Sequence, residues 1–79
     1  MKVLLFAKPK EIVGASVVEI ALDCPCTAAD AKLALAKHFP VLSTIIAACM
    51  LAVNNAYADD LTILNDGDEV ALIPPVSGG

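Results

Sequence analysis

The sequence pattern of one helix, with a clear start and a clear end, lies between strand-like runs. This pattern limits the folds that the chain can adopt more than any other feature does. Thr27 and Asp30 have the spacing of an N-terminal capping box, and Pro40 ends the helical pattern that follows. Leu33 points away from the apolar face of this helix and is predicted to be exposed. With 79 residues, the chain has room for one domain with a modest core. The apolar residues at helical spacing, which should face a sheet, are Ala28, Ala31, Leu35 and Phe39.

Strand-like runs lie on both sides of this helix. Residues 1–7 and 16–22 precede it and should form an antiparallel hairpin, joined by a connection over 8–15 with room for one helical turn. The run 41–48 fits either a short helix or an irregular connection. We expect the last strand to pair with the first at the centre of a mixed sheet, which defines an α+β two-layer domain. A turn at 23–26 should lead into the helix. After the helix we expect strands at 49–53, 56–58 and 69–73, with a turn at 54–55, a loop over 59–64 and a turn at 65–68.

Composition narrows the possible partners. Apolar residues make up 58% of the chain and charged residues 18%, a balance that excludes intrinsic disorder. The apolar excess fits either an exposed partner surface or simply a high alanine content, and composition alone leaves both open. The net charge is −4, with no arginine, so no basic patch exists and nucleic-acid binding is disfavoured. The clean apolar run over 45–53 is too short to span a membrane, and the amino terminus lacks a secretion signal. A cytoplasmic location without membrane contact is therefore predicted.

The three cysteines predict reduced thiols. An odd number of cysteines does not build a closed disulfide framework. Cys24 and Cys26 resemble half of a metal motif, but no second pair follows, so we expect no metal site. Cys49 falls in a predicted core strand. The one histidine, His38, lies late in the helix, where a packing role or a helix-end charge is favoured over catalysis.

The last six residues carry the strongest functional signal. Pro74 and Pro75 cannot donate ladder hydrogen bonds, so the sheet should stop there and divide a domain over 1–73 from a tail over 74–79. Six extended residues reach about 20 Å. Gly78 and Gly79 have no Cβ, so the end could thread a narrow channel and expose its carboxylate to chemistry. A frayed terminus is the alternative.

Several segments of the chain resemble the small subunit of molybdopterin synthase. The resemblance is carried by Asp-Gly-Asp-Glu-Val at 66–70 and Pro-Pro-Val-Ser-Gly-Gly at 74–79, with support from Ala-Val-Asn at 52–54, Tyr57, and the segments 3–7 and 11–14. It covers essentially the whole chain. It implies a ubiquitin-like β-grasp fold, with a mixed sheet of about five strands, one main helix across it and a flexible Gly-Gly tail.

The resemblance also implies a sulfur-carrier role. A partner enzyme would use ATP to adenylate the carboxylate of Gly79, and a persulfide donor would convert the adenylate to a thiocarboxylate. The thiocarboxylate would donate sulfur to cyclic pyranopterin monophosphate and so build the molybdopterin dithiolene. The chain would need no tightly bound cofactor and no active site of its own, since the large subunit of a heterotetramer would supply the catalytic groups.

Roles for the neighbouring residues follow from the same resemblance. Gly78 would give clearance beside the reacting Gly79. Leu72 and Ile73 are predicted to contact the large subunit, because adjacent strand residues cannot all face the helix; the alternative is that both are core residues. The tail segment that would thread the partner is Pro74, Pro75, Val76, Ser77 and Gly78.

Three other functions remain open at this point. A carrier of the same fold could serve thiamin, amino-acid or tRNA thiolation with identical tail chemistry. A non-covalent β-grasp interaction module would work without Gly79. A protein modifier would form isopeptide bonds to lysine and would appear as conjugates of higher mass.

Overall fold

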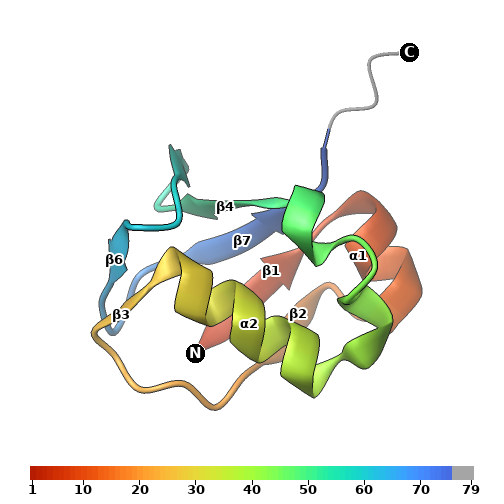
Figure 1. The fold of residues 1–79 in the computed structure, drawn as a ribbon, viewed down its shortest axis with the longest axis horizontal. Helices are drawn as coiled ribbons and strands as arrows, with labels where there is room; N and C mark the ends of the chain where they lie inside the picture. Colours follow the sequence, from red (N-terminus) through yellow and green to blue (C-terminus); the bar gives the residue numbers. More distant parts are fainter. Residues whose placement is uncertain (76–79) are drawn as a thin grey trace.

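The computed structural model describes residues 1–75, in which helix α2 crosses one face of a five-stranded mixed sheet (Figure 1). The helical elements are α1 (Ala7–Val13), α2 (Ala28–His38) and the short 3-10 turns η1 (Pro40–Leu42) and η2 (Ile46–Ala48). The strands are β1 (Lys2–Leu5), β2 (Val17–Glu19), β3 (Cys26–Thr27), β4 (Met50–Val53), β5 (Ala56–Ala58), β6 (Ile63–Leu64) and β7 (Val70–Ile73). This is the predicted β-grasp architecture, an α+β fold with one main helix.

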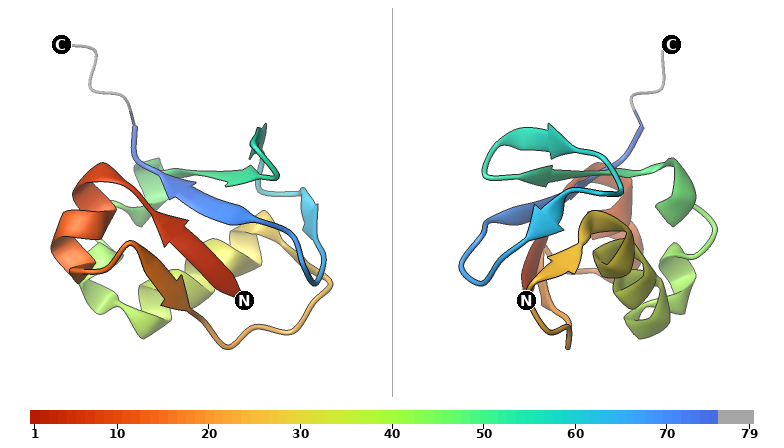
Figure 2. Two further views of the ribbon diagram at one scale, coloured as in Figure 1. Left: turned by 180° about the vertical axis from the view of Figure 1, so that it is seen from behind. Right: turned by 60° about the vertical axis from the view of Figure 1, so that its left-hand side comes forward.

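The sheet is built around the first and last strands. Its order is β2-β1-β7-β4-β5, with β1 and β7 parallel and the other neighbours antiparallel. Leu4 lies opposite Ala71 in the central pair, and Val3 lies opposite Val18 in the predicted hairpin. The expected central pairing and the expected hairpin are both confirmed (Figure 2).

Helix α2 starts and ends as the sequence predicts. The Asp30 N–H donates to Thr27 Oγ1 over 3.2 Å, and the Thr27 N–H donates to Asp30 Oδ2 over 3.1 Å, which completes the capping box. The helix ends at His38, and Pro40 begins η1. Leu33 is 66% exposed, as expected. The face turned toward the sheet buries Ala28, Ala31 and Leu35, while Phe39 is half-buried beyond the helix end.

Two connections hold more regular structure than expected. The segment 8–15 is mostly helix α1, because Pro9 sits in the first turn, where its missing N–H is not needed, and Gly14 caps the end at φ +84°. The loop expected over 59–64 contains β6, which pairs with β3 at the expected 23–26 turn, with Cys26 opposite Leu64. The ambiguous segment 41–48 contains η2 and most of η1.

The core lies between α2 and the sheet. Val3 and Leu5 of β1 and Val70 and Leu72 of β7 are at most 1% exposed. Alternation along these strands sends Leu4 and Ile73 to the opposite side of the sheet. The remaining fully buried large apolar side chains, which complete the core, are Ile20, Leu35, Leu42, Leu51 and Leu64.

The backbone conformation of Ala7 predicts that glycine at this position stabilises the fold. Its φ of +53° is a left-handed conformation that costs a residue with a Cβ about 1 kcal/mol or more. Ala7→Gly should therefore raise the free energy of unfolding by about 1 kcal/mol, measured by urea denaturation. The control Ala34→Gly, near the middle of α2, should lower it by about 0.5–1 kcal/mol. An Ala7→Gly variant that loses stability like the control would contradict this account.

Candidate functional site

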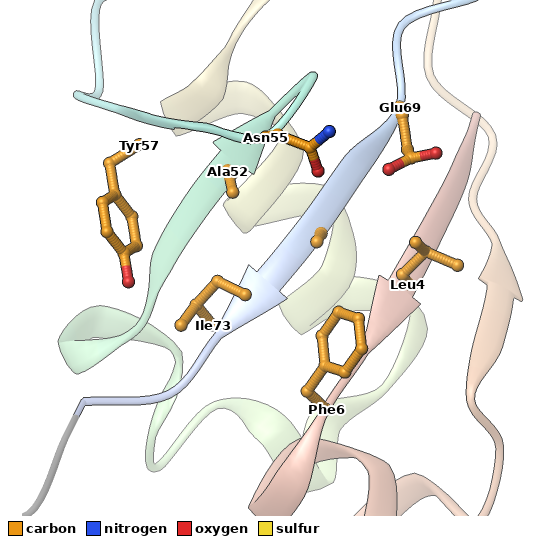
Figure 3. Close-up of a pocket in the computed structure, with 8 residues that line it drawn as sticks. Leu4, Phe6, Ala52, Asn55, Tyr57, Glu69 and Ile73 are labelled. Atoms are coloured by element: carbon orange, nitrogen blue, oxygen red, sulfur yellow. The ribbon is translucent and has the colours of Figure 1, made fainter.

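The candidate site is the face of the sheet that turns away from α2, called the open face below. Figure 3 shows the side chains that gather on it from β1, β4, β5 and β7. Together they surround a shallow depression of about 330 Å³. Its lining is mostly apolar and consists of Leu4, Phe6, Ala52, Asn55, Tyr57, Glu69, Ala71 and Ile73.

The open face is apolar at one end and polar at the other. Phe6 and Ile73 lie at the end where β7 finishes, whereas Glu69 and Asn55 lie at the opposite end (Figure 3). Phe6 is 48% exposed and Tyr57 is 68% exposed, although both are large and apolar in most of their surface. Exposed aromatic side chains around an apolar depression are typical of a surface that binds another protein.

The sheet ends at the place the prolines predict. Strand β7 stops at Ile73, which pairs with Met50 of β4. Pro74 is half-buried and Pro75 is exposed. Because neither residue has an N–H, neither can extend the ladder. The chain therefore leaves the sheet directly beside the apolar end of the open face.

The predicted tail residues are placed only in part. Pro74 and Pro75 belong to the exit from the sheet. The residues predicted to thread the partner or to carry sulfur beyond them, Val76, Ser77, Gly78 and Gly79, lie outside the described residues.

The structure separates the two predicted interface residues. Leu72 is 0% exposed and packs in the core on the α2 side of the sheet, so its expected place on a partner surface is wrong for the folded chain. Ile73, one position later, lines the open face. Strand alternation required such a split, and contact with α2 determines which of the two is buried.

Sequence reasoning missed most of the open face. Residues 1–7 were predicted as a strand of the hairpin, and within them Leu4 and Phe6 point to the side opposite Val3 and Leu5. The alternation within β1 was the signal available for them. Tyr57 comes from a three-residue strand, which is too short for a periodic pattern to reveal its exposed side.

Two turns at the polar end of the open face are joined by side chains. Asn54 Nδ2 donates to Asp68 Oδ1 over 3.1 Å, and the Glu69 N–H donates to Asn54 Oδ1 over 2.9 Å. The Asn65 N–H donates to Asp68 Oδ2 over 2.8 Å. The backbone N–H of Asn65, followed by the Asn54 side chain, holds the pKa of Asp68 below its usual value of 3.8. This network fixes the start of β7, and with it the position of Glu69.

The thiols and the histidine lie apart from the open face. Burial, with a further contribution from neighbouring Cys24, raises the pKa of Cys26 to about 11. Burial also raises the pKa of Cys49, whose thiol donates to the Ile45 carbonyl over 3.3 Å. Both thiols are therefore protonated at neutral pH and are poor nucleophiles. His38 is exposed in the last turn of α2, where its Nε2 accepts from the Ala21 N–H over 3.4 Å.

The described part of the chain shows neither a metal cluster nor a spanning helix. Within residues 1–75, no three or more histidine, cysteine or acidic side chains converge as metal ligands would. No helix in this part combines the length and the apolar character that a membrane crossing requires.

The fold and the open face define a ubiquitin-like β-grasp protein, and comparison with known proteins narrows the class. The model of the ThiS family matches residues 3–79. The chain belongs to the ThiS family. A molybdopterin synthase sulfur carrier subunit from Chlamydomonas reinhardtii is 37% identical to it over 81 residues, covering 100% of this chain and 98% of the relative.

Solved structures agree with the fold. SAMP1 from Haloferax volcanii superposes with a TM-score of 0.84 at 33% identity, covering 100% of this chain and 98% of that one. A chain from the protein–protein complex of subunits 1 and 2 of molybdopterin-converting factor from Helicobacter pylori superposes with a TM-score of 0.65 at 26% identity, covering 99% of this chain and 96% of that one. The second match is to a chain solved within a two-subunit complex.

The hydrogen bonds of Asp68 predict a pH dependence of stability. Because the folded chain lowers the pKa of this carboxyl, its stabilising contribution is complete above the unfolded value of about 3.8 and is lost as pH falls through the lower folded value. Asp68→Asn should therefore lower the thermal midpoint at pH 6 and narrow the gap to wild type below pH 3.8. Asp66→Asn, in the same turn, keeps Asp68 and should retain the wild-type pH profile. An equal gap at both pH values for Asp68→Asn would contradict the assignment.

Proposed function

We propose that this chain is the sulfur carrier of a molybdopterin synthase and that it carries sulfur as a thiocarboxylate on Gly79. Membership of the ThiS family and the names of its full-length relatives support this proposal. The observation that supports it most directly is the place where the chain leaves the sheet. The chain leaves β7 at Pro74, beside the apolar end of an open docking face, so a partner that binds this face would receive the terminal residues.

The chemistry requires an activated carboxyl group. A carboxylate is a poor electrophile, so a partner enzyme first joins it to the α-phosphorus of ATP, which forms an acyl-adenylate and releases pyrophosphate. The terminal sulfur of a persulfide then displaces AMP, and a thiol cleaves the S–S bond to leave the thiocarboxylate. The thiocarboxylate transfers sulfur to cyclic pyranopterin monophosphate, and water restores the carboxylate.

The chain itself contributes a docking surface and a reactive end. The acid–base groups and the substrate pocket belong to the large subunit, and ATP is a substrate of the activating enzyme rather than a resident cofactor of this chain. The two-subunit Helicobacter complex supports a large-subunit partner, and we propose a heterotetramer of two small and two large subunits in the cytoplasm. Because one Gly79 must reach both partners, activation and sulfur transfer occur in turn.

The restricted backbone of the exit lowers the cost of threading. Pro74 and Pro75 each have φ fixed near −65°, so less conformational entropy is lost when the tail enters a channel. A protein of this size has little interior for a complete active site, which agrees with chemistry that takes place inside its partners.

The proposal predicts a specific mass change. Incubating the full chain with its adenylating enzyme, ATP and a sulfide source should add the mass difference between sulfur and oxygen, and fragmentation should place it on Gly79. A chain without Gly79 should fold normally, as judged by circular dichroism, and gain no mass. Absence of the gain under conditions that charge a known carrier would instead favour a non-covalent interaction module.

The positions of Ile73 and Leu72 predict different effects when each is replaced by aspartate. Ile73→Asp should leave the fold intact and weaken binding to the large subunit about tenfold or more, since it places a charge in the apolar part of the open face. Leu72→Asp should cost several kcal/mol, because it buries a carboxylate in the core, and should largely unfold a domain of this size. Calorimetric titration and thermal melts would measure the two effects.

A matched control lies on η1. Val41 is 57% exposed away from the open face, so Val41→Asp adds the same charge and should leave both binding and folding near wild type. If folded Ile73→Asp binds as tightly as Val41→Asp, the open face is not the docking surface.

A second candidate function is a protein modifier. It is favoured by the TM-score of 0.84 with SAMP1, a protein described as a small archaeal modifier. A modifier would join its terminal glycine to lysine side chains, so a tagged chain expressed in its own host would appear in conjugates of higher mass. Such conjugates, together with intact molybdopterin synthesis after deletion of the gene, would replace the first proposal by the second.

A further inference from the structure

The outer face of α2 carries an exposed apolar side chain that the proposed function does not use. Leu33 lies at the middle of this face and is 66% exposed. At 100° per residue, Ala29 and Ala36 flank it on one side of the helix, and Asp30 and Lys37 flank it on the other. We call these five residues the α2 face. It lies on the helix layer, whereas the chain leaves β7 toward the top of the molecule in Figure 1.

The α2 face is complementary to the same face of a second copy whose helix runs antiparallel to the first. Asp30 and Lys37 are seven residues apart, and so are Ala29 and Ala36. Both pairs are centred on Leu33 to within half a residue. A two-fold axis through Leu33 that sets two such helices antiparallel would bring Asp30 of each opposite Lys37 of the other. It would likewise bring Ala29 of each opposite Ala36 of the other.

The side chains permit this approach. Alanine is small enough to let two helix backbones come close, so the contact can be packed without rearrangement. Beside the alanine edge lies a groove of about 300 Å³ between α2 and η2, to which Ile46 and Ala47 contribute apolar walls. Leu33 of a second copy is long enough to reach into this groove.

The charges on the α2 face are suited to the pairing. Asp30 is exposed and is held in place by the capping box, in which its Oδ2 accepts from the Thr27 N–H. Lys37 is exposed in the last turn. The other charges that border the groove, Lys32 and Asp60, pair with each other at 3.8 Å. The charges on the face therefore match those of a second copy rather than those of a uniformly basic or acidic partner.

We propose that two copies of this chain associate through their α2 faces, with the helices antiparallel and Asp30 of each paired with Lys37 of the other. The interface is isologous and closes on itself, so it gives a dimer and not a filament. One helix face is smaller than a standard stable interface, so the dimer is weak and depends on concentration and salt. The open face and the tail stay accessible in both copies, and the inference does not depend on the proposed function.

Sedimentation equilibrium of the full chain, in reductant to prevent disulfides between chains, tests the proposal. At low ionic strength we expect a reversible monomer–dimer equilibrium in the micromolar to millimolar range of Kd. Leu33→Glu should weaken the dimer roughly tenfold or more, since it places two carboxylates at the two-fold axis. Lys37→Glu should weaken it roughly fivefold or more, and added salt should reduce that effect.

Two further variants make the test specific. Lys8→Glu makes the same charge change on α1 and should leave the association constant unchanged. Adding Asp30→Asn to Lys37→Glu removes the repulsion between acidic groups while keeping a side-chain oxygen that can accept from the Thr27 N–H, so it should restore part of the lost association. Circular dichroism confirms folding, and the Lys37 series stands by itself if Leu33→Glu fails to fold.

Three results would overturn the proposal. The wild-type chain could remain monomeric at millimolar concentration, which would leave the α2 face to a different protein. A dimer could form that neither Leu33→Glu nor Lys37→Glu weakens. A dimer could also be abolished by Ile73→Asp, which would place the contact on the open face instead.

Discussion

The parallel pairing of β1 with β7 is the constraint on which the rest of the structure depends. It brings the first and last strands together at the centre of the sheet, with Leu4 opposite Ala71 and Leu5 opposite Leu72. This register places Phe6, which follows β1, close to Ile73, which ends β7 (Figure 3). The apolar end of the open face and the exit of the chain are therefore consequences of one strand pair.

The pairing of β1 with β7 also separates the residues that stabilise the core from those that remain available to a partner. Val70 and Leu72 face α2 and are almost completely buried, whereas Ile73 remains on the open face. A small domain has little interior beyond its core, and the buried thiols are protonated and far less reactive than thiolates. The protein can meet these limits by presenting a surface and a carboxylate while its partners provide the chemistry.

Local signals in the sequence predicted the elements that have strong local causes. The capping box of Thr27 and Asp30, the Asn54-Asn55 turn and the Gly67 turn all appear where expected, because each depends on a few adjacent residues. Helix α1 is longer than the single turn expected over 8–15, because Pro9 is accommodated in a first helical turn and Gly14 ends the helix in a left-handed conformation. Strands β3 and β6 have two residues each, so only tertiary pairing defines them.

The functional surface was less predictable than the fold. The proline stop and the glycine end identify the tail, but the side chains of the open face come from four strands and meet only after folding. Leu72 and Ile73 were predicted to share one role, whereas strand alternation and the position of α2 bury Leu72 and leave Ile73 on the open face. The most direct test of the account is a titration of the isotope-labelled full chain with its large subunit, followed by amide NMR. We expect the largest shifts at Phe6, Ala71, Ile73 and Gly79, whereas shifts confined to α2 would contradict the account.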